Sequence, residues 1–523
     1  MSNKILTALE AIDLIQSGDT VTVAGFVGTG VPDELLDALQ KKFSKTQTPQ
    51  NLCLLFTAGP GDGHEKGLNR LADKKLVRRT IGGHYGLIPR ISQLALDNEI
   101  EAYNIPQGII SHLYRDISAK KPGVITKIGL GTFADPRIEG GKVNEKSTKD
   151  LIKLIDIEGE EYLFVPSFPI NVAILRGSVA DPVGNISMRK EALRLDNLSQ
   201  AMATKNSNGK VIVQVERICE EMLPSREVEI PSSLVDCIVV ASEENHYQTY
   251  ATVYSPYLDG SQRKEVSHDK SVKLDYKKII ARRAFLELPE TKETINLGIG
   301  TPEVIADVAQ EEGRISELIL TTEAGVCGGQ PAGGLSFGAG VNTDAIICQN
   351  QQFDFYDGGG IHTAFLGMAQ ADQKGDVNVS RFSGRLAGAG GFVNISSSAR
   401  NLVFCGAFST GDLNIAVHEE KLQIVNDGKV NKFVKQVEQI TFCGALAEAA
   451  NHSVKFVTER AVFVFKEGRL HLTEIAPGIN IGDEILAKME FQPVVEEFSI
   501  MSNRIFCDGP MGLYKNINLQ TYP

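Results

Sequence analysis

The 523-residue sequence lacks any apolar run close to the roughly 18 residues that a membrane-spanning helix needs. Its first residues, MSNKILTALEAIDLIQSGD, include acidic side chains and no continuous apolar core, which is not the pattern of a secretory signal. Low-complexity segments are also missing. These absences favour a cytoplasmic protein, and we expect no membrane partner.

Paired cysteines and the histidine spacings typical of metal sites are missing too. The eight cysteines form no CxxC pair, and the nine histidines form no HExxH motif. Most of the cysteines lie in apolar runs, as small core residues of a reducing compartment do. We therefore expect no metal site and no disulfide framework. The cysteines are Cys53, Cys219, Cys237, Cys327, Cys348, Cys405, Cys443 and Cys507.

Basic residues are in deficit, with 53 Lys and Arg against 65 Asp and Glu, a formal net charge of −12. This balance argues against non-specific binding of nucleic acid, and an anionic substrate would need a local basic patch. With 42% hydrophobic and 23% charged residues, the composition is that of a globular protein. The length exceeds what one hydrophobic core supports, so two or more domains are expected.

One order of local patterns begins near residue 20. A β-prone run at 20–24 passes through a glycine-rich turn at 25–32 into a helix, 33–39, that has acidic residues in its first turn. The next strand, 52–56, ends on Thr57-Ala58-Gly59. This order indicates a βα unit followed by a second strand.

The same order recurs about 270 residues later. A strand at 294–297 leads into the turn Gly298-Ile299-Gly300-Thr301-Pro302 and a helix at 303–308. The next strand, 318–322, ends on Glu323-Ala324-Gly325. The repeat predicts two homologous open α/β halves, of which only the second places a carboxylate at its strand end.

The predicted fold class is therefore α/β, with two homologous domains. We expect an N-terminal domain at 1–254, a polar, turn-rich linker at 255–273, and a C-terminal domain at 274–523. The pattern becomes β-rich after residue 400. Hairpin turns are predicted at Asn426-Asp427-Gly428-Lys429 and at Lys466-Glu467-Gly468-Arg469.

Glu323 is the candidate around which the chemistry is organised. It ends an apolar strand and is followed at once by small residues, at the edge where open α/β sheets bind ligands. A carboxylate is a nucleophile where water is held off, and its attack on a carbonyl needs fixed donors for the developing oxyanion. The segments Asn104–Gly108 and Gly388–Ile395 offer a glutamine amide and a glycine-rich backbone. Cys327 lies four residues on, but no histidine is near it in sequence.

Together and in this order, these segments resemble the family I CoA-transferases along essentially the whole chain. The likeness is greatest to single-chain bacterial acetate/propionate CoA-transferases and extends more distantly to succinyl-CoA:ketoacid transferases. It rests on the stretches VAGFVGTGVPDELLDAL, IGGHYGLIPRI, AYNIPQG, TKIGLGTFADPR, NLGIGTPEVIA, QFDFYDGGG, GAGGFVNIS, VTERAVFVF and EIAPGI.

The resemblance implies a role for particular residues. Glu323 would be the catalytic glutamate that becomes a glutamyl-CoA thioester in a ping-pong reaction, with the amide of Gln107 and the N–H of Gly391 as oxyanion donors. Further candidates for contact with CoA are Gly298, Gly300, Gly388, Gly390 and Arg385.

The resemblance also implies the location of the site, the substrates and the oligomeric state. The site would lie in the cleft between the two halves, with acyl-CoA and short-chain carboxylates as substrates. Coenzyme A would be a co-substrate, with no permanently bound cofactor, and the protein a homo-oligomer (dimer or tetramer). Where related transferases often carry a hydroxyl residue or Asn after the glutamate, this chain has Ala324, which leaves the preferred acid open.

Three other functions remain open at this point. A nicotinamide-dependent dehydrogenase is suggested by the two GxGxP turns, but neither turn has the third glycine of the fingerprint. An acyl-CoA hydrolase on the same scaffold would use water as the final acceptor. A catalytically silent ligand-binding protein would have no physical reason to keep Glu323, Gln107 and Gly391 together.

Overall fold

The computed structural model describes residues 4–265 and 273–513 of the chain. They form two compact units that are not continuous in sequence. Unit 1 comprises Met1–Lys264, Thr321–Gly360 and Ser380–Ser398, and unit 2 comprises Glu265–Leu320, Ile361–Val379 and Ala399–Pro523. Glu323, Gln107 and Gly391 all belong to unit 1.

Unit 1 is built on a seven-stranded sheet in which every pair of neighbours is parallel. The chain fills one side of β1 first and then the other, so the sheet has a switch point beside β1, as doubly wound sheets do. In spatial order the strands are β14 (Cys237–Val240), β11 (Lys210–Val215), β8 (Val172–Arg176), β1 (Thr20–Val23), β2 (Leu52–Ala58), β3 (Val77–His84) and β4 (Glu101–Asn104).

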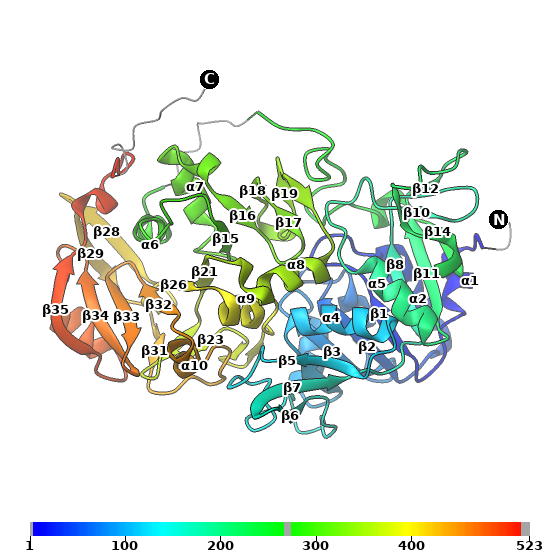
Figure 1. Cartoon of the computed structure of the whole chain (residues 1–523), viewed down its shortest axis with the longest axis horizontal. Coiled ribbons are helices and arrows are strands. Elements are labelled where there is room, and N and C mark those ends of the chain that lie inside the picture. The colour runs from blue at the N-terminus through cyan, green and yellow to red at the C-terminus, as the bar shows by residue number, and fades with distance from the viewer. Residues whose placement is uncertain (1–3, 266–272, 514–523) are drawn as a thin grey trace. The chain divides into compact units, whose positions relative to one another are not determined.

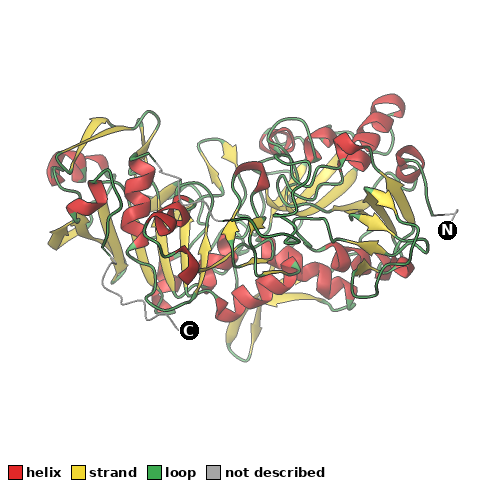
Figure 2. Cartoon of the chain, turned by 90° about the horizontal axis from the view of Figure 1, so that it is seen from above, coloured by secondary structure: helices red, strands yellow, loops and turns green. Residues whose placement is uncertain are grey.

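Helices cover both faces of this sheet (Figures 1 and 2). Alternate residues of β2 point to opposite faces, so Leu54 packs in the core under α2 while Leu55 packs in the core under α4. A strand buried on both faces reads as a continuous apolar run, as β2 does. One face carries α1 (Ala8–Ile12), α2 (Asp33–Thr46) and α3 (Pro89–Leu96), and the other α4 (Gln107–Ser118) and α5 (Asn197–Asn206).

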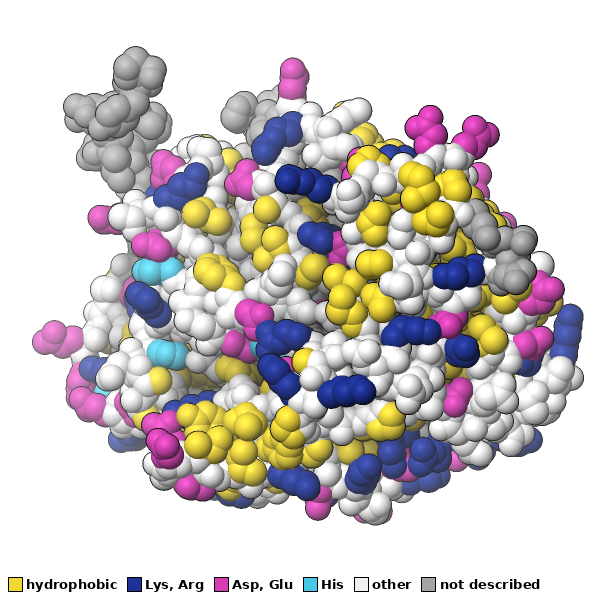
Figure 3. Space-filling view, turned by 45° about the vertical axis from the view of Figure 1, so that its right-hand side comes forward, with side chains coloured by type: hydrophobic (Ala, Val, Ile, Leu, Met, Phe, Trp, Pro, Cys, Tyr) yellow, Lys and Arg dark blue, Asp and Glu magenta, His cyan; other side chains and the backbone are white. Residues whose placement is uncertain are grey.

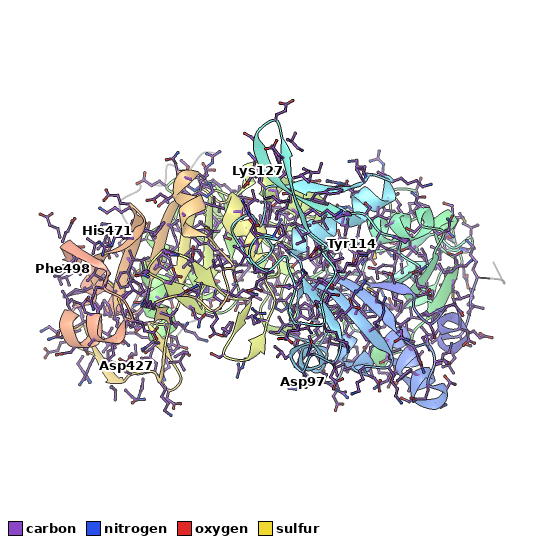
Figure 4. The ribbon with its side chains drawn as sticks, turned by 90° about the horizontal axis from the view of Figure 1, so that it is seen from below. Asp97, Tyr114, Lys127, Asp427, His471 and Phe498 are labelled. Atoms are coloured by element: carbon purple, nitrogen blue, oxygen red, sulfur yellow. The ribbon has the colours of Figure 1, made fainter. Side chains whose placement is uncertain are left out.

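Helix α4 is held firmly against the sheet. The hydroxyl of Tyr114, labelled in Figure 4, accepts a hydrogen bond from Thr22 Oγ1 on β1 at 2.8 Å. Gln200 on α5 donates to the same threonine oxygen at 2.9 Å. Because Tyr114 is fully buried, this contact fixes α4, and with it Gln107 at the first position of the helix.

Two smaller sheets extend unit 1. One has three strands, with Lys127 (Figure 4) following its first strand and pairing with Glu160 on another. Its strands are β5 (Gly123–Thr126), β7 (Glu160–Pro166) and β6 (Lys153–Ile157). The other has four short strands: β12 (Arg217–Ile218), β9 (Val179–Ala180), β10 (Ile186–Ser187) and β13 (Val228–Ile230).

The later segments of unit 1 are short elements packed on this framework. The chain enters the unit at the end of β16 (Ile319–Thr321). The first segment then forms β17 (Val326–Cys327), β18 (Gln330–Pro331), β19 (Gly340–Val341), β20 (Ala345–Ile346), α8 (Gln349–Phe355) and the π-helical turn η6 (Tyr356–Gly360). The second forms β24 (Arg381–Phe382), β25 (Arg385–Leu386) and α9 (Phe392–Ser398).

Unit 2 has its own layer of strands. Parallel pairing joins β15 (Thr294–Leu297), β21 (Thr363–Gly367), β26 (Asn401–Cys405) and β32 (Ser453–Val457). Antiparallel pairing then adds β33 (Ala461–Lys466) and β34 (Arg469–Ile475), and β35 (Val494–Ile500) runs parallel to β34. Its helices are α6 (Tyr276–Phe285), α7 (Val304–Glu311), α10 (Gly444–Ala449) and α11 (Ile481–Glu484).

Small sheets complete unit 2. They are β23-β22-β31, formed by Val377–Asn378, Gln370–Asp372 and Phe433–Val434, then β27 (Ser409–Thr410) with β30 (Val430–Asn431), and β28 (Asn414–His418) with β29 (Lys421–Asn426). The predicted fold class, α/β with two domains built on parallel strands, is confirmed. The repeated order of strand, glycine turn, helix and strand is present as β1–α2–β2 and as β15–α7–β16.

One predicted hairpin is correct and the other is wrong. Glu467 and Gly468, both with positive φ, connect the paired strands β33 and β34. At 426–429 the flanking strands do not pair with each other, since β29 pairs with β28 and β30 with β27. The real hairpin turn is Glu419-Glu420.

The predicted domain boundaries at residues 254 and 274 remain a prediction. The two compact units are defined by contacts in space and not by continuous stretches of sequence, so they do not test these boundaries. Of the predicted linker 255–273, residues 266–272 lie outside the described residues.

No helix in the described part of the chain combines the length and apolarity needed to cross a membrane. On the face shown in Figure 3, basic and acidic side chains are interspersed.

Candidate active site

Glu323 lies in the tight turn between β16 and β17. The amide of Thr322 donates to the carbonyl of Val326 at 3.0 Å, and that of Gly325 donates to the carbonyl of Thr322 at 3.1 Å. Gly325 has a φ of +110°, and a methyl group added there would overlap the carbonyl oxygen of Ile347. Only glycine therefore fits this turn without strain.

The residue after the glutamate points into the protein. Ala324 is fully buried in an apolar cluster with Phe26, Leu195 and Phe337. Its methyl group lies close to Gly338, where an added Cβ would be only 3.1 Å away. In this conformation Ala324 therefore braces the turn from the core side.

The carboxyl group of Glu323 is surrounded by protein although the residue keeps some exposure. Burial raises its pKa from 4.5 to about 7, and its own backbone amide partly opposes this shift. Burial disfavours the ionised form of a carboxyl group, and a less stabilised carboxylate is also a more reactive one. The group is thus half-ionised near neutral pH.

Gly391 lies directly against Glu323. A methyl group added at Gly391 would be 3.0 Å from Cγ of Glu323 and 3.3 Å from its Cβ. Among the described residues, no acceptor is recorded for the Gly391 amide. An amide with that placement can donate to an oxygen that binds beside the glutamate.

The loop that carries Gly391 is fastened to the end of β3. Tyr85 donates its amide to Ala387 O at 2.7 Å, and Gly390 donates to Gly83 O at 2.8 Å. A methyl group added at Gly388 would come within 3.0 Å of the β3 backbone. This close backbone approach needs the glycine-rich sequence.

Gln107 meets the same loop from α4. Its backbone amide donates to Gly390 O at 3.0 Å, and its Oε1 lies 3.6 Å from where a Cβ on Gly390 would be. The side chain is 1% exposed, and its Nε2 has no partner among the described residues. A buried amide donor without a partner costs free energy unless a bound molecule accepts its hydrogen bond. The structure thus brings Glu323, Gln107 and Gly391 together.

Similarity to known proteins shows which family the chain belongs to. Residues 5–241 match the model of the family described as Coenzyme A transferase. The chain is 40% identical to acetate CoA-transferase YdiF of Escherichia coli K12 over 512 residues, which are 97% of this chain and 96% of that protein. This chain belongs to the family I CoA-transferases.

Other members extend the comparison. The caffeate CoA-transferase of Acetobacterium woodii is 41% identical to this CoA-transferase over 98% of both chains. A solved structure, acyl-CoA transferase YdiF from E. coli O157:H7 in a thioester complex with CoA, superposes with a TM-score of 0.93 at 38% identity, covering 98% of each chain. The expected distant likeness is found as well, since human mitochondrial succinyl-CoA:3-ketoacid coenzyme A transferase 2 is 24% identical over 91% of this chain and 87% of that protein.

As a CoA-transferase, the protein moves CoA between an acyl-CoA and a carboxylate. Of the residues predicted to contact CoA, Gly388 and Gly390 already use their amides, which donate to Ser380 O and Gly83 O. Arg385 is exposed in the β24–β25 hairpin. Gly298 and Gly300 belong to unit 2, where Gly300 has a φ of +88° and no atom within 4 Å of an added Cβ. CoA contact by these residues stays a prediction.

Arg381 and Cys327 each make contacts that hold the structure near the site. Arg381 donates to Val143 O and to Glu139, both at 3.0 Å, so it anchors its hairpin. The thiol of Cys327 lies 3.3 Å from Gln352 Oε1, and burial raises its pKa. A thiol with a raised pKa is a poor nucleophile, so Cys327 is structural in this CoA-transferase.

His84 is a residue at this site that sequence reasoning missed. It ends β3, and its Cβ and Cδ2 lie 3.7 Å from where a Cβ on Gly390 would be. Its Nδ1 is buried and has no hydrogen-bond partner in the described part of the chain, and burial lowers the pKa of the imidazole to about 4, so the ring is neutral. The only signal was its place in the IGGHYGLIPRI stretch.

A cavity of about 370 Å³ opens elsewhere at the carboxyl edge of the same sheet. It lies beyond β8, β11 and β14, and its lining includes Arg176, Lys190 and His246 but none of the residues above. Its two cations are already paired, Arg176 with Glu191 and Lys190 with Glu216. The cavity is therefore distinct from the contacts around Glu323.

Proposed function

We propose that this CoA-transferase moves CoA between a short-chain acyl-CoA and a free short-chain carboxylate, of the acetate or propionate type. The observation that carries the proposal is the contact of Glu323 with Gly391, beside the Gln107 amide, which has no partner within residues 4–265 and 273–513. The likeness to an acetate CoA-transferase over nearly the whole chain supports the choice of substrate class. The caffeate enzyme marks aromatic acids as the alternative acceptors to test.

The first half-reaction begins with attack by a carboxylate oxygen of Glu323 on the thioester carbonyl carbon. The C–S bond breaks, CoA leaves as the thiolate, and an acyl-glutamyl anhydride remains. Negative charge develops on the thioester oxygen during this step. Donors from the Gly391 amide and Gln107 Nε2 stabilise that charge because they are fixed in place before the reaction starts.

The thiolate then attacks the glutamyl carbonyl of the anhydride. The anhydride C–O bond breaks, the first carboxylate leaves, and the enzyme holds CoA as a glutamyl thioester. A second carboxylate reverses the sequence: it attacks the glutamyl thioester to form a new anhydride, and the released thiolate takes the new acyl group. Contacts to the distant parts of CoA supply binding free energy that offsets the unfavourable anhydride.

The trapped intermediate tests this mechanism. The protein is incubated with acetyl-CoA and no acceptor acid, and its intact mass and peptides are measured with and without hydroxylamine. We expect an adduct with the mass of CoA less one water, located on Glu323, sensitive to hydroxylamine and missing in Glu323→Gln. The matched control is Glu65→Gln, an exposed glutamate of the same unit, which should still form the adduct.

Two outcomes would count against the proposal. An adduct that persists in Glu323→Gln would place the nucleophile elsewhere. Steady release of CoA from acetyl-CoA without any acceptor would instead indicate a hydrolase, with water in the role of the second carboxylate.

A further inference from the structure

A chain of polar contacts lies behind the two oxyanion donors, and the proposed reaction does not use it. It runs from the first turn of α4 through Asn394 on α9 to Asp357 in η6, and on to His112 and Asp354. All of these residues belong to unit 1. Asn394 is fully buried, so its amide must satisfy its hydrogen bonds inside the protein.

Asn394 joins the two segments that carry the donors. Its Oδ1 accepts a hydrogen bond from the backbone amide of Gly108 at 3.1 Å, one residue after Gln107. It stands three residues after Gly391, in the helix that starts directly behind that glycine. A methyl group added at Gly108 would overlap Asn394 Nδ2. The first turn of α4 is therefore in close contact with this one side chain.

Asp357 fixes which way the Asn394 amide points. Asn394 Nδ2 donates to both oxygens of Asp357 at 3.0 Å, which leaves Oδ1 facing Gly108. If the amide were reversed, its NH₂ group would face the Gly108 N–H and its oxygen would face a carboxylate. Both contacts would then be unfavourable, so the carboxylate selects the orientation that receives Gly108.

Asp357 is itself surrounded by charged and titratable groups. From α4, His112 Nδ1 lies 3.8 Å away, while His112 Nε2 lies 3.1 Å from Asp354 on α8. Arg115 pairs with Asp354 at 2.6 Å. Burial raises the pKa of Asp357 to about 6, opposed by His112 and Asn394. Asp357 is therefore a largely buried carboxylate, and both of its oxygens accept hydrogen bonds from Asn394 Nδ2.

We propose that Asn394 is a positioning residue for the transfer reaction: its amide, oriented by Asp357, sets the position of Gln107 relative to Gly391. The inference rests on the proposed function, because it concerns donors that act on the oxyanion. Neither Asn394 nor Asp357 touches the reacting atoms. Loss of their contact lowers the rate of the chemical step and leaves binding of acyl-CoA nearly unchanged.

Asn394→Asp gives the sharpest test. The introduced carboxylate keeps an acceptor for Gly108 but faces Asp357 without a donor. At high pH the two carboxylates repel, whereas at low pH they share a proton and the contact returns. We expect kcat at pH 8 to fall roughly 10- to 100-fold with KM for acetyl-CoA within about 3-fold, and the ratio of variant to wild-type kcat to recover toward pH 5.5.

A complementary exchange tests the pair directly. In the double variant Asn394→Asp/Asp357→Asn, the carboxylate at 394 accepts from both Gly108 and the introduced amide at 357, so each hydrogen bond has a donor again. We expect kcat to return to within about 5-fold of wild type and the extra pH dependence to vanish. Asn350→Asp is the matched control, because Asn350 is a buried asparagine whose side-chain amide donates to a different partner, Ser199 Oγ, at 2.7 Å.

The outcomes separate the possibilities. Asn394→Asp with wild-type kcat at pH 8 would overturn the inference, as would a folded double variant that recovers nothing or an Asn350→Asp variant with the same pH-dependent loss. Near-ultraviolet circular dichroism establishes that each variant folds. The adduct assay on Glu323→Gln tests the proposed function separately. If the nucleophile were a residue other than Glu323, that assay would change, whereas the result of the Asn394→Asp/Asp357→Asn double variant would not.

Discussion

At the scale of single residues, the site depends on a glutamate that protein surrounds and on two donors that have no partner among the residues the structure describes. Local sequence patterns located Glu323 and the two segments that carry the donors, and the resemblance to the CoA-transferases singled out Gln107 and Gly391 within those segments. Sequence reasoning missed His84 and Asn394, which carry no local pattern. Their importance comes from what lies opposite them in space, Gly390 for His84 and Gly108 for Asn394.

The raised pKa of Glu323 predicts how the rate depends on pH. Only the ionised carboxylate attacks, so kcat/KM for acetyl-CoA should fall tenfold per pH unit below an apparent pKa near 7. The measurement is a pH–rate profile in buffers of constant ionic strength. A profile that stays flat down to pH 5 would show that the carboxyl group titrates at its ordinary value.

The same pKa predicts an effect on stability with a definite sign. Because the folded-state pKa is above the ordinary value of 4.5, ionisation of Glu323 destabilises the fold progressively as pH rises from 4.5 to about 7. Glu323→Gln removes this cost. The difference in free energy of unfolding between the variant and wild type should increase in favour of the variant by ~1–3 kcal/mol across that interval, and should then remain constant at higher pH. Urea titrations at several pH values measure the difference, and a constant difference would contradict it.

Removal of one oxyanion donor should slow the reaction. Gln107→Ala takes away the amide Nε2 and should lower kcat by roughly 10²–10³, while the backbone contact of residue 107 with Gly390 O remains. The rate of adduct formation with acetyl-CoA should fall with kcat. If Gln107→Ala lowered neither rate, the side chain would only brace its turn.

At the scale of elements, local signals were reliable where one segment fixes its own conformation. The turn Glu467-Gly468 is an example, with adjacent strands paired across it. The Asn426–Lys429 segment has the same turn chemistry, yet Ser409 and Arg460 hydrogen-bond to Asp427 and β30 pairs with β27. The partners of that strand lie elsewhere in the chain, so composition of the turn could not reveal them.

The turn that holds Glu323 should tolerate no side chain after Ala324. Gly325→Ala places a side chain on a residue whose φ is already +110°, and the added methyl group overlaps Ile347 O. The variant should therefore destabilise the protein by at least ~3 kcal/mol. Gly18→Ala separates the two effects, since Gly18 has a φ of +88° but nothing within 4 Å, and should cost about 1 kcal/mol. Chemical denaturation of both variants gives the comparison, and equal costs would rule out the overlap.

At the scale of the whole molecule, the sequence repeat led to the right fold class, and the family resemblance was correct over the full length. The compact units could not be predicted, because contact between distant segments decides them. Residues 321–360 and 380–398 come from the second half of the sequence but belong to unit 1. No change in composition marks the points at which the chain crosses between units.

The complete reaction should show two independent half-reactions. Double-reciprocal plots of rate against acetyl-CoA at several propionate concentrations should be parallel. Labelled acetate should also exchange into acetyl-CoA with no second acid present, because the enzyme–CoA intermediate can react with the acid that has just left. Intersecting lines together with no exchange would indicate a single complex of both substrates.

The return of residues 321–360 and 380–398 to unit 1 has a consequence for biosynthesis. When Lys264 leaves the ribosome, the sheet and the Gln107 helix are already made, but Ser398 follows only about 130 residues later. At roughly 5–20 residues per second, the segments that complete the unit follow the first 264 residues after about 7–27 s. During that interval the nascent chain exposes the apolar surface that Ala324 and Phe337 later cover. We therefore expect chaperones to bind the nascent chain at this stage.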